Sequence, residues 1–142
     1  MMTLAHEELA VGTELPTVVR FTSNRQLVQY AAAAHDYSGI HYDRGYAQER
    51  GFPDVIVHGF LKAAFLADLA VEWAGAGSAF ESFSARYSGV DLVGAPITCR
   101  GRVTAIDADT RRLTLELWTE NAHGSRTTTA TGVLRLPNEG TR

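Results

Sequence analysis

This sequence has very few cysteines and no large excess of positive or negative charge. The 142 residues include a single cysteine, Cys99, which cannot form an internal disulfide, so a disulfide-stapled scaffold is excluded. Such sparing use of cysteine suits a reducing compartment. The 13 Lys and Arg residues nearly balance the 16 Asp and Glu residues, and the net charge is −3. A charge of that sign and size gives no general attraction to nucleic acid or to an anionic membrane, and we expect neither as a partner.

Long hydrophobic runs are also missing. The longest apolar-rich stretch, 59–74, contains Lys62, Asp68 and Glu72 and is too short and too charged to span a bilayer. The opening segment, MMTLAHEELAVG, has acidic residues where a signal peptide has basic ones, and it lacks the apolar region of such a peptide. These features predict a cytoplasmic protein.

The balance of residue types is that of a globular chain, with 45% apolar and 20% charged residues. A chain of this length buries one core without disulfides or metals. No repeat, low-complexity segment or linker divides it. We therefore expect one domain over 1–142, with its core over about 9–136 and a short polar tail at 138–142.

Short elements are predicted in the first part of the chain. Ser23 and Gln26 fit a capping box, which places a helix directly after them, with Leu27, Tyr30 and Ala31 on one face. The expected elements are a strand over 17–22, a helix over 26–35, a loop over 36–43 and a short helix over 44–50 that Gly51 and Pro53 end.

The stretch 59–74 is the clearest helix in the sequence. Its apolar residues cover most of the helical circumference, which is typical of a buried helix, and Gly75 and Gly77 end it. Alternating, β-branched segments follow, and they predict long antiparallel strands joined by tight turns. The expected strands cover 79–88, 97–106, 111–121 and 125–136.

Early helices, one buried helix and later long strands together indicate an α+β fold. A long antiparallel sheet wrapped around one apolar helix buries both surfaces at once, which favours the hot-dog fold. An open α+β sandwich with its helices on one face is the alternative.

A carboxylate and an imidazole lie five residues apart in the loop after the first helix, at Asp36 and His41. A loop containing Gly39 can turn both side chains toward one point, where they would share a water molecule as an acid and a base. The structural alternative is that Asp36 caps a helix or turn and that His41 makes a structural hydrogen bond.

The dipeptide His58-Gly59 opens the buried helix. The backbone N–H groups in the first turn of a helix have no partner within it, and the dipole is positive there, so a carbonyl oxygen gaining negative charge can be held. The alternatives are that Gly59 only allows the helix to start close to a strand and that His58 is a packing residue.

No metal site is expected. His41 and Asp43 are close in sequence but His58 is distant, and no compact His/Cys cluster resembles a zinc site. A cysteine nucleophile is rejected because Cys99 lies within a predicted strand, where burial leaves a thiol inert.

Three segments together resemble the MaoC-like hydratase family, which comprises the (R)-specific enoyl-CoA hydratases and related hydroxyacyl-thioester dehydratases. They are the run DYSGIHYD from Asp36 to Asp43, the pair Tyr46-Ala47, and the run Val57-His58-Gly59. The family pattern is an Asp, a His five residues later, an Asp or Asn, and then a His-Gly that opens the central helix. The resemblance extends over about 9–136 and includes the segment GVDLVGAP at 89–96.

This resemblance implies a function for each position that it matches. Asp36 and His41 would activate one water for addition to the double bond of a trans-2-enoyl thioester, and the reverse step is dehydration. The N–H of Gly59 would polarise the thioester carbonyl, with His58 beside it. No metal or redox cofactor is implied, because the CoA or carrier arm is part of the substrate. A homodimer or higher homo-oligomer is the usual assembly of the family, and some members work as hetero-oligomers.

The chain departs from the family at Ser38 and Gly39, where the usual hydratases carry Asn-Pro. Ser38 would orient the loop or the substrate in place of the Asn. Divergent members that act on steroid-derived acyl-CoA also depart here. Two further functions remain open: an acyl-CoA thioesterase, and a subunit of a hetero-oligomeric hydratase for bulky, steroid-like acyl-CoA.

Overall fold

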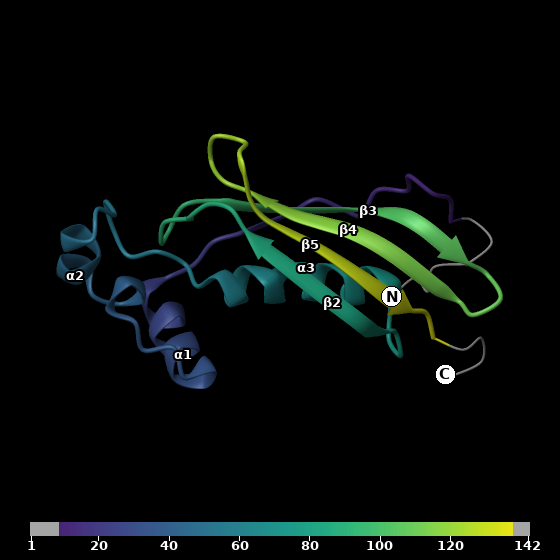
Figure 1. Cartoon of the computed structure of the whole chain (residues 1–142), viewed down its shortest axis with the longest axis horizontal. Helices are drawn as coiled ribbons and strands as arrows, with labels where there is room; N and C mark the ends of the chain where they lie inside the picture. The colour runs from purple at the N-terminus through teal and green to yellow at the C-terminus, as the bar shows by residue number, and fades with distance from the viewer. Residues whose placement is uncertain (1–8, 138–142) are drawn as a thin grey trace.

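Five antiparallel strands form one sheet that curves over a single long helix in the computed structural model, which describes residues 9–137 (Figure 1). The strands are β1 (Val18–Arg20), β2 (Ala79–Tyr87), β3 (Ile97–Asp107), β4 (Arg112–Glu120) and β5 (Arg126–Arg135). The helices are α1 (Asn24–Ala34), the short 3-10 helix η2 (Gly39–His41), α2 (Arg44–Glu49) and α3 (Gly59–Ala74). The predicted α+β architecture is confirmed. The predicted polar tail and the first eight residues lie outside the described part of the chain.

The strand order is β1-β3-β4-β5-β2, and it differs in one respect from a simple succession of hairpins. Strands β3 to β5 follow one another across the sheet, as the tight turns predict, but β2 pairs with β5 and not with β3. The segment 88–96 is too long and too irregular for a hairpin turn, and within it Leu92 makes an antiparallel bridge to Ile56. This crossing carries the chain from the edge strand β2 across the sheet to β3, which lies next to the opposite edge strand β1.

Helix α3 has the bounds that its apolar pattern predicts. Its buried side chains all belong to the core cluster except Lys62 and Ala63, and the helix packs against β2, β3, β4 and β5. The buried residues of α3 are Leu61, Lys62, Ala63, Phe65, Leu66, Leu69, Ala70 and Ala74. Lys62 is the one charged residue among them, and its burial is unusual because a cation is almost never fully buried unless it is paired.

The sheet presents alternate residues to α3, because successive side chains of a strand point to opposite faces. On β4 the inward residues are Leu113, Leu115 and Leu117, each fully buried, as the sequence pattern predicts. Cys99 on β3 is also fully buried, and burial raises the pKa of its thiol to about 11. The predicted burial of Cys99 is therefore confirmed, and a buried thiol with a raised pKa is a poor nucleophile.

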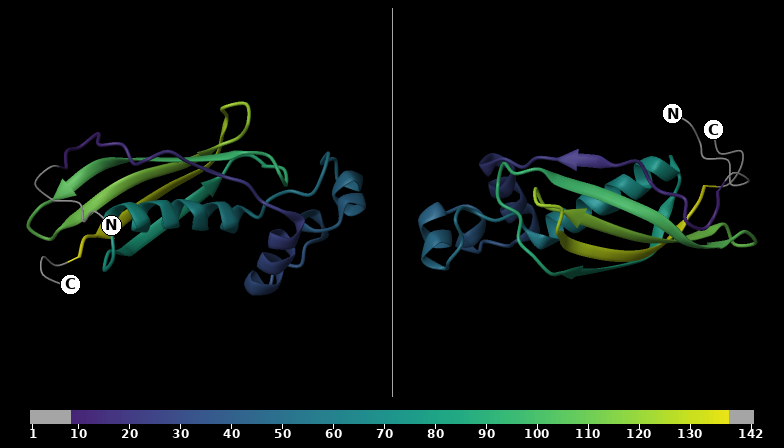
Figure 2. Two further views of the ribbon diagram at one scale, coloured as in Figure 1. Left: turned by 180° about the vertical axis from the view of Figure 1, so that it is seen from behind. Right: turned by 90° about the horizontal axis from the view of Figure 1, so that it is seen from above.

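The short helices lie together beyond one end of the sheet, next to the start of α3 (Figures 1 and 2). The Oγ of Ser23 accepts a hydrogen bond from the N–H of Gln26 at 3.2 Å, so α1 begins where the predicted cap places it. His35 ends α1 in the left-handed conformation, with φ of 53°. The chain therefore turns sharply into the loop that carries Asp36. Within residues 9–137, no helix is long and apolar enough to cross a membrane.

Candidate active site

Asp36 and His41 face each other across the loop that follows α1. The Oδ2 of Asp36 lies 3.5 Å from the Nε2 of His41. The Asp36 side chain is 42% exposed, whereas His41 is only 7% exposed. The Asp36 carboxylate is therefore in contact with solvent, and the His41 imidazole next to it is buried. The two side chains lie close together, as the sequence predicts.

The second ring nitrogen of His41 defines its tautomer. Nδ1 lies 2.7 Å from the backbone oxygen of Ile56. A carbonyl oxygen only accepts hydrogen bonds, so Nδ1 carries the proton and donates it. In the neutral ring, Nε2 then holds the free lone pair and directs it toward the side of Asp36. Such a second hydrogen bond is how proteins commonly fix the tautomer and orientation of a functional histidine.

His58 lies directly against His41. The two rings stack with centroids 3.8 Å apart and planes 19° from parallel. Tyr30 of α1 meets the His58 ring edge-on, with their centroids 4.9 Å apart. His58 is 1% exposed, and neither of its ring nitrogens makes a hydrogen bond to another described residue. The pKa of His58 is lowered, first by burial and second by the neighbouring His41, while Asp36 has a smaller opposing effect. A lowered pKa favours the neutral form of His58, and this ring packs against His41.

Gly59 begins α3 immediately after His58. A Cβ built at this position would lie 2.9 Å from the ring of Tyr87 at the end of β2, and Tyr87 also packs edge-on against Phe60. The glycine is therefore required sterically, which agrees with its structural interpretation. The N–H groups in the first turn of a helix have no partner within the helix, so the binding role of the Gly59 N–H stays a prediction.

The loop between Asp36 and Asp43 is fixed mainly by its own backbone. The N–H of Ser38 donates to Oδ1 of Asp36 at 3.3 Å, while the exposed Ser38 side chain makes no capping hydrogen bond. Gly39 is covered by the ring of Tyr46, which would lie 2.8 Å from an added Cβ. A proline at position 39 would meet that ring. Asp43 caps α2 by accepting from the N–H of Tyr46 at 3.0 Å.

Asp36, His41 and His58 each place one potential ligand atom within 4.8 Å of the others. The expectation that His58 lies apart from His41 is wrong, because the bend before α3 returns the chain to the loop. The two imidazole rings are nearly parallel, however, so their lone pairs lie in parallel planes and do not converge as the ligands of a tetrahedral ion do. The absence of a functional metal remains a prediction.

Comparison with known proteins identifies the family. The family model described as "MaoC like domain" matches residues 7–124. The chain belongs to the MaoC-like family. It is 28% identical to the (R)-specific enoyl-CoA hydratase of Aeromonas caviae over 94% of this chain and 100% of that protein. The crystal structure of the (R)-hydratase from A. caviae has 27% identity, covers 92% of this chain and 99% of its own, and superposes with a TM-score of 0.85. The resemblance and the hot-dog fold predicted from the sequence are thereby confirmed.

Two further matches are proteins of Mycobacterium tuberculosis. The β subunit of its 3-oxo-4,17-pregnadiene-20-carboxyl-CoA hydratase is 26% identical over 68% of this chain and 75% of that subunit. A chain of the ChsH1-ChsH2 complex from the same organism has 25% identity over 89% of this chain and 98% of its own, with a TM-score of 0.81. The first is named as a subunit of a CoA-thioester hydratase, and the second is a chain of a named complex.

Three residues around this MaoC-like site were not singled out from the sequence. Tyr87 covers Gly59, and Lys62 and Asp91 form a buried ion pair one helical turn away. For Lys62 a signal existed, because it is the single cation of a largely apolar helix. For Asp91 and Tyr87 no signal existed, because their roles depend on which segments the fold brings together.

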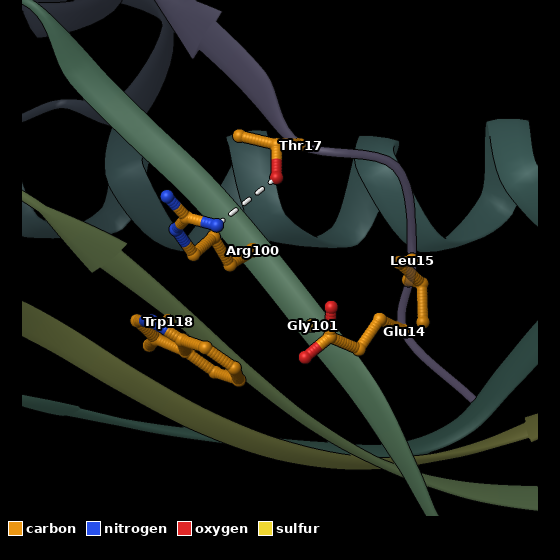
Figure 3. A pocket seen from close by; sticks show the side chains of 6 residues that line it. All are labelled: Glu14, Leu15, Thr17, Arg100, Gly101 and Trp118. Atoms are coloured by element: carbon orange, nitrogen blue, oxygen red, sulfur yellow. Dashed lines mark hydrogen bonds between the residues drawn. The ribbon is translucent and has the colours of Figure 1, made fainter. Parts of the chain in front are cut away.

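A small hollow on the outer face of the sheet lies apart from this site (Figure 3). Its lining residues are Glu14, Leu15, Thr17, Arg100, Gly101 and Trp118, and Arg100 donates to Thr17 there at 3.2 Å. Arg100 and Arg102 form ion pairs with Glu120 and Glu116 on this face. None of the predicted site residues lines the hollow.

Proposed function

We propose that this chain is an enoyl-thioester hydratase, which adds water reversibly to a trans-2-enoyl-CoA or carrier-bound enoyl group and forms the 3-hydroxyacyl thioester. The observation that supports it most directly is the 3.5 Å approach of Asp36 Oδ2 to an Nε2 of His41 that holds a free lone pair. The hydratases among the relatives supply the substrate class.

In the proposed step, one water lies between the side chains of Asp36 and His41 and donates a hydrogen bond to each. One of the two groups removes a proton from this water while the oxygen attacks C3 of the enoyl chain. The C2–C3 double bond breaks, and its electrons move toward the thioester oxygen. The same group then returns the proton to C2. One water is added in total, and the pair ends the step in its starting protonation state, with no further reagent or cofactor needed.

The negative charge that develops on the thioester oxygen needs a donor. The N–H of Gly59 is proposed for this role, because it lies at the positive end of α3 and directly follows His58, which stacks on His41. His58 is proposed to hold the site rather than to exchange protons, since its lowered pKa keeps it neutral. Ser38 is proposed to orient Asp36 through its backbone N–H.

The test is a hydration assay that follows the loss of the conjugated enoyl absorbance. Asp36→Asn and His41→Ala should each lower the rate by about 10²–10⁴, the usual contribution of a positioned acid or base. Asp109→Asn and His123→Ala, which change the same residue types in exposed turns, serve as matched controls and should retain the wild-type rate. A site variant that retains the wild-type rate would show that the pair is not catalytic. Release of free CoA by wild type, without hydration, would instead establish a thioesterase.

Assembly with a second subunit is proposed alongside this activity. The relatives from M. tuberculosis are a named β subunit and a chain of a two-protein complex. Strand β2 lies at one edge of the sheet, where it has a neighbour on one side only, β5. A copy of this chain pairing along that edge would cover it. Sedimentation of the purified chain should therefore give a dimer or larger species, and a monomer that gains hydratase activity only with a partner would favour the hetero-oligomeric alternative.

A further inference from the structure

A buried ion pair joins α3 to the segment before β3. The Nζ of Lys62 lies 2.8 Å from Oδ2 of Asp91, and the two side chains are only 2% and 1% exposed. Removing two charges from water costs several kcal/mol per ion, and a buried pair is often no more stabilising than apolar residues of similar volume. Stability alone is therefore a weak reason for this pair.

Further hydrogen bonds hold both ends of the pair. Lys62 also donates from Nζ to the backbone oxygen of Gly89 at 2.9 Å. The Oγ1 of Thr127 on β5 donates to Oδ2 of Asp91 at 2.6 Å, and Thr119 on β4 contacts Thr127 at 2.9 Å. The pair is thus tied to two central strands of the sheet, which are rigid elements.

The same two residues hold the chain on both sides of His58. The backbone N–H of Lys62 donates to the carbonyl of His58 at 3.2 Å, which is the first hydrogen bond of α3. The backbone oxygen of Asp91 accepts from the N–H of Val57 at 2.8 Å. The residues at 57 and 58 therefore cannot shift relative to the sheet without moving Lys62 or Asp91. Gly59 is the next residue, so the direction of its N–H depends on this connection.

We propose that Lys62 and Asp91 are positioning residues for the hydratase step, because they fix the start of α3 and hence the direction of the Gly59 N–H. This inference depends on the proposed function. Neither residue needs to touch the substrate. A misplacement of about 1 Å in a catalytic group can cost on the order of a hundredfold in rate, so a small shift of this turn has a large expected effect.

The kinetic test uses the double variant Lys62→Met/Asp91→Asn, which leaves no unpaired buried charge. We expect kcat to fall by about ten- to a hundredfold with little change in KM, because the donor acts mainly in the transition state. The matched control is Arg102→Met/Glu116→Gln, which removes an exposed ion pair on the outer face of the sheet and should leave kcat unchanged. A kcat equal to wild type in a folded double variant overturns the proposal.

A spectroscopic test separates positioning from general stability. Crotonyl-CoA labelled with ¹³C at the thioester carbonyl is bound to Asp36→Asn, in which turnover is expected to be slowed by about 10²–10⁴, and its carbonyl stretch is recorded by infrared difference spectroscopy before turnover. This short chain is used because it enters any acyl pocket. Binding should lower the stretching frequency, and adding Lys62→Met/Asp91→Asn should remove most of that shift. A merely structural pair would lower the melting temperature and leave the shift of the folded protein intact.

Two further outcomes have defined meanings. If Asp36→Asn itself shows no carbonyl shift, the proposed role of Gly59 fails, and the positioning inference fails with it. If the double variant does not fold, Thr127→Val replaces it, because this change removes one hydrogen bond to Asp91 and keeps the ion pair. Thr127→Val should then show part of the loss in kcat and in carbonyl shift, and wild-type values for both overturn the proposal.

Discussion

The two ends of α3 are equally buried but are built from different chemistry. At the C-terminal end, Leu69, Ala70 and Ala74 are each at most 3% exposed and belong to the apolar core cluster. At the N-terminal end, His58 and Lys62 are each 1% exposed. One end of the helix is therefore an ordinary core, and the other is a polar site enclosed by protein.

This difference separates stability from function along a single element. Apolar burial stabilises the fold by roughly 25 cal/mol for each Å² removed from water, whereas buried polar groups cost free energy unless they are paired. At the N-terminal end, the ring of His58 and Oδ1 of Asp91 make no hydrogen bond to other described residues. Changes at this end should therefore affect turnover, and changes at the other end should affect unfolding.

Within α3, the largest effect on turnover should come from removing the N–H of Gly59. Gly59→Ala is not a clean test, because its Cβ would meet the Tyr87 ring at 2.9 Å. Gly59→Pro in a Tyr87→Ala background avoids that contact. Proline suits the first position of a helix, and the ψ of 134° at His58 suits a residue before proline. We expect kcat to fall by about 10²–10³, as when an oxyanion donor is lost.

The control for this change is Gly59→Ala in the same Tyr87→Ala background, which keeps the N–H and adds one methyl group. Both variants are compared by kcat, KM and urea unfolding. Equal kcat values for the proline and alanine variants would show that the N–H of Gly59 does not act in the reaction.

In the apolar part of α3, beyond its first two turns, Leu66→Ala should reduce the free energy of unfolding by about 2–5 kcal/mol, because it leaves a cavity in a fully buried part of the core. Val71→Ala is the matched control on the same helix, since Val71 is 37% exposed, and it should change stability little. Urea unfolding gives the stability, and the hydration assay gives the rate of the folded protein. A large loss of kcat in Leu66→Ala, with unfolding unchanged, would contradict the division between the two ends.

The sequence predicts the apolar end of α3 better than the polar end. An apolar stretch followed by Gly75 defines the helix and its burial, because both depend on residues adjacent in sequence. Asp36 and His41 are also found from sequence, since they lie five positions apart in one loop. Lys62 and Asp91 are 29 residues apart, and only the crossing of the segment 88–96 brings them together. The same limit applies to β2, whose pairing with β5 no local pattern reveals.

The site end should also make stability depend on pH through His58. Its pKa is lowered in the folded protein, mainly by burial, so the unfolded chain binds a proton more readily as pH falls below about 6.5. The free energy of unfolding should therefore decrease from about pH 7.5 to about pH 5.5. His58→Asn should reduce this dependence, with His41, Asp36 and Tyr30 still present around it. Urea unfolding at the two pH values measures the difference, and identical pH dependence in both proteins would rule out His58 as its source.

The smallest effect is expected on the outer face of the sheet, where ion pairs meet solvent. Arg102 contacts Glu116 there with its side chain half exposed, in contrast to the buried pair of Lys62 and Asp91. Arg102→Met should change the free energy of unfolding by only about 0–1 kcal/mol, because an exposed pair is screened and already hydrated. Lys62→Met should cost about 3–5 kcal/mol, since it leaves the Asp91 carboxylate buried without its cation. Urea unfolding of the two single variants tests the contrast, and added salt should weaken only the outer pair. Equal losses in the two variants would mean that Asp91 reaches water through a local opening, and the start of α3 would then be less rigid than its hydrogen bonds indicate.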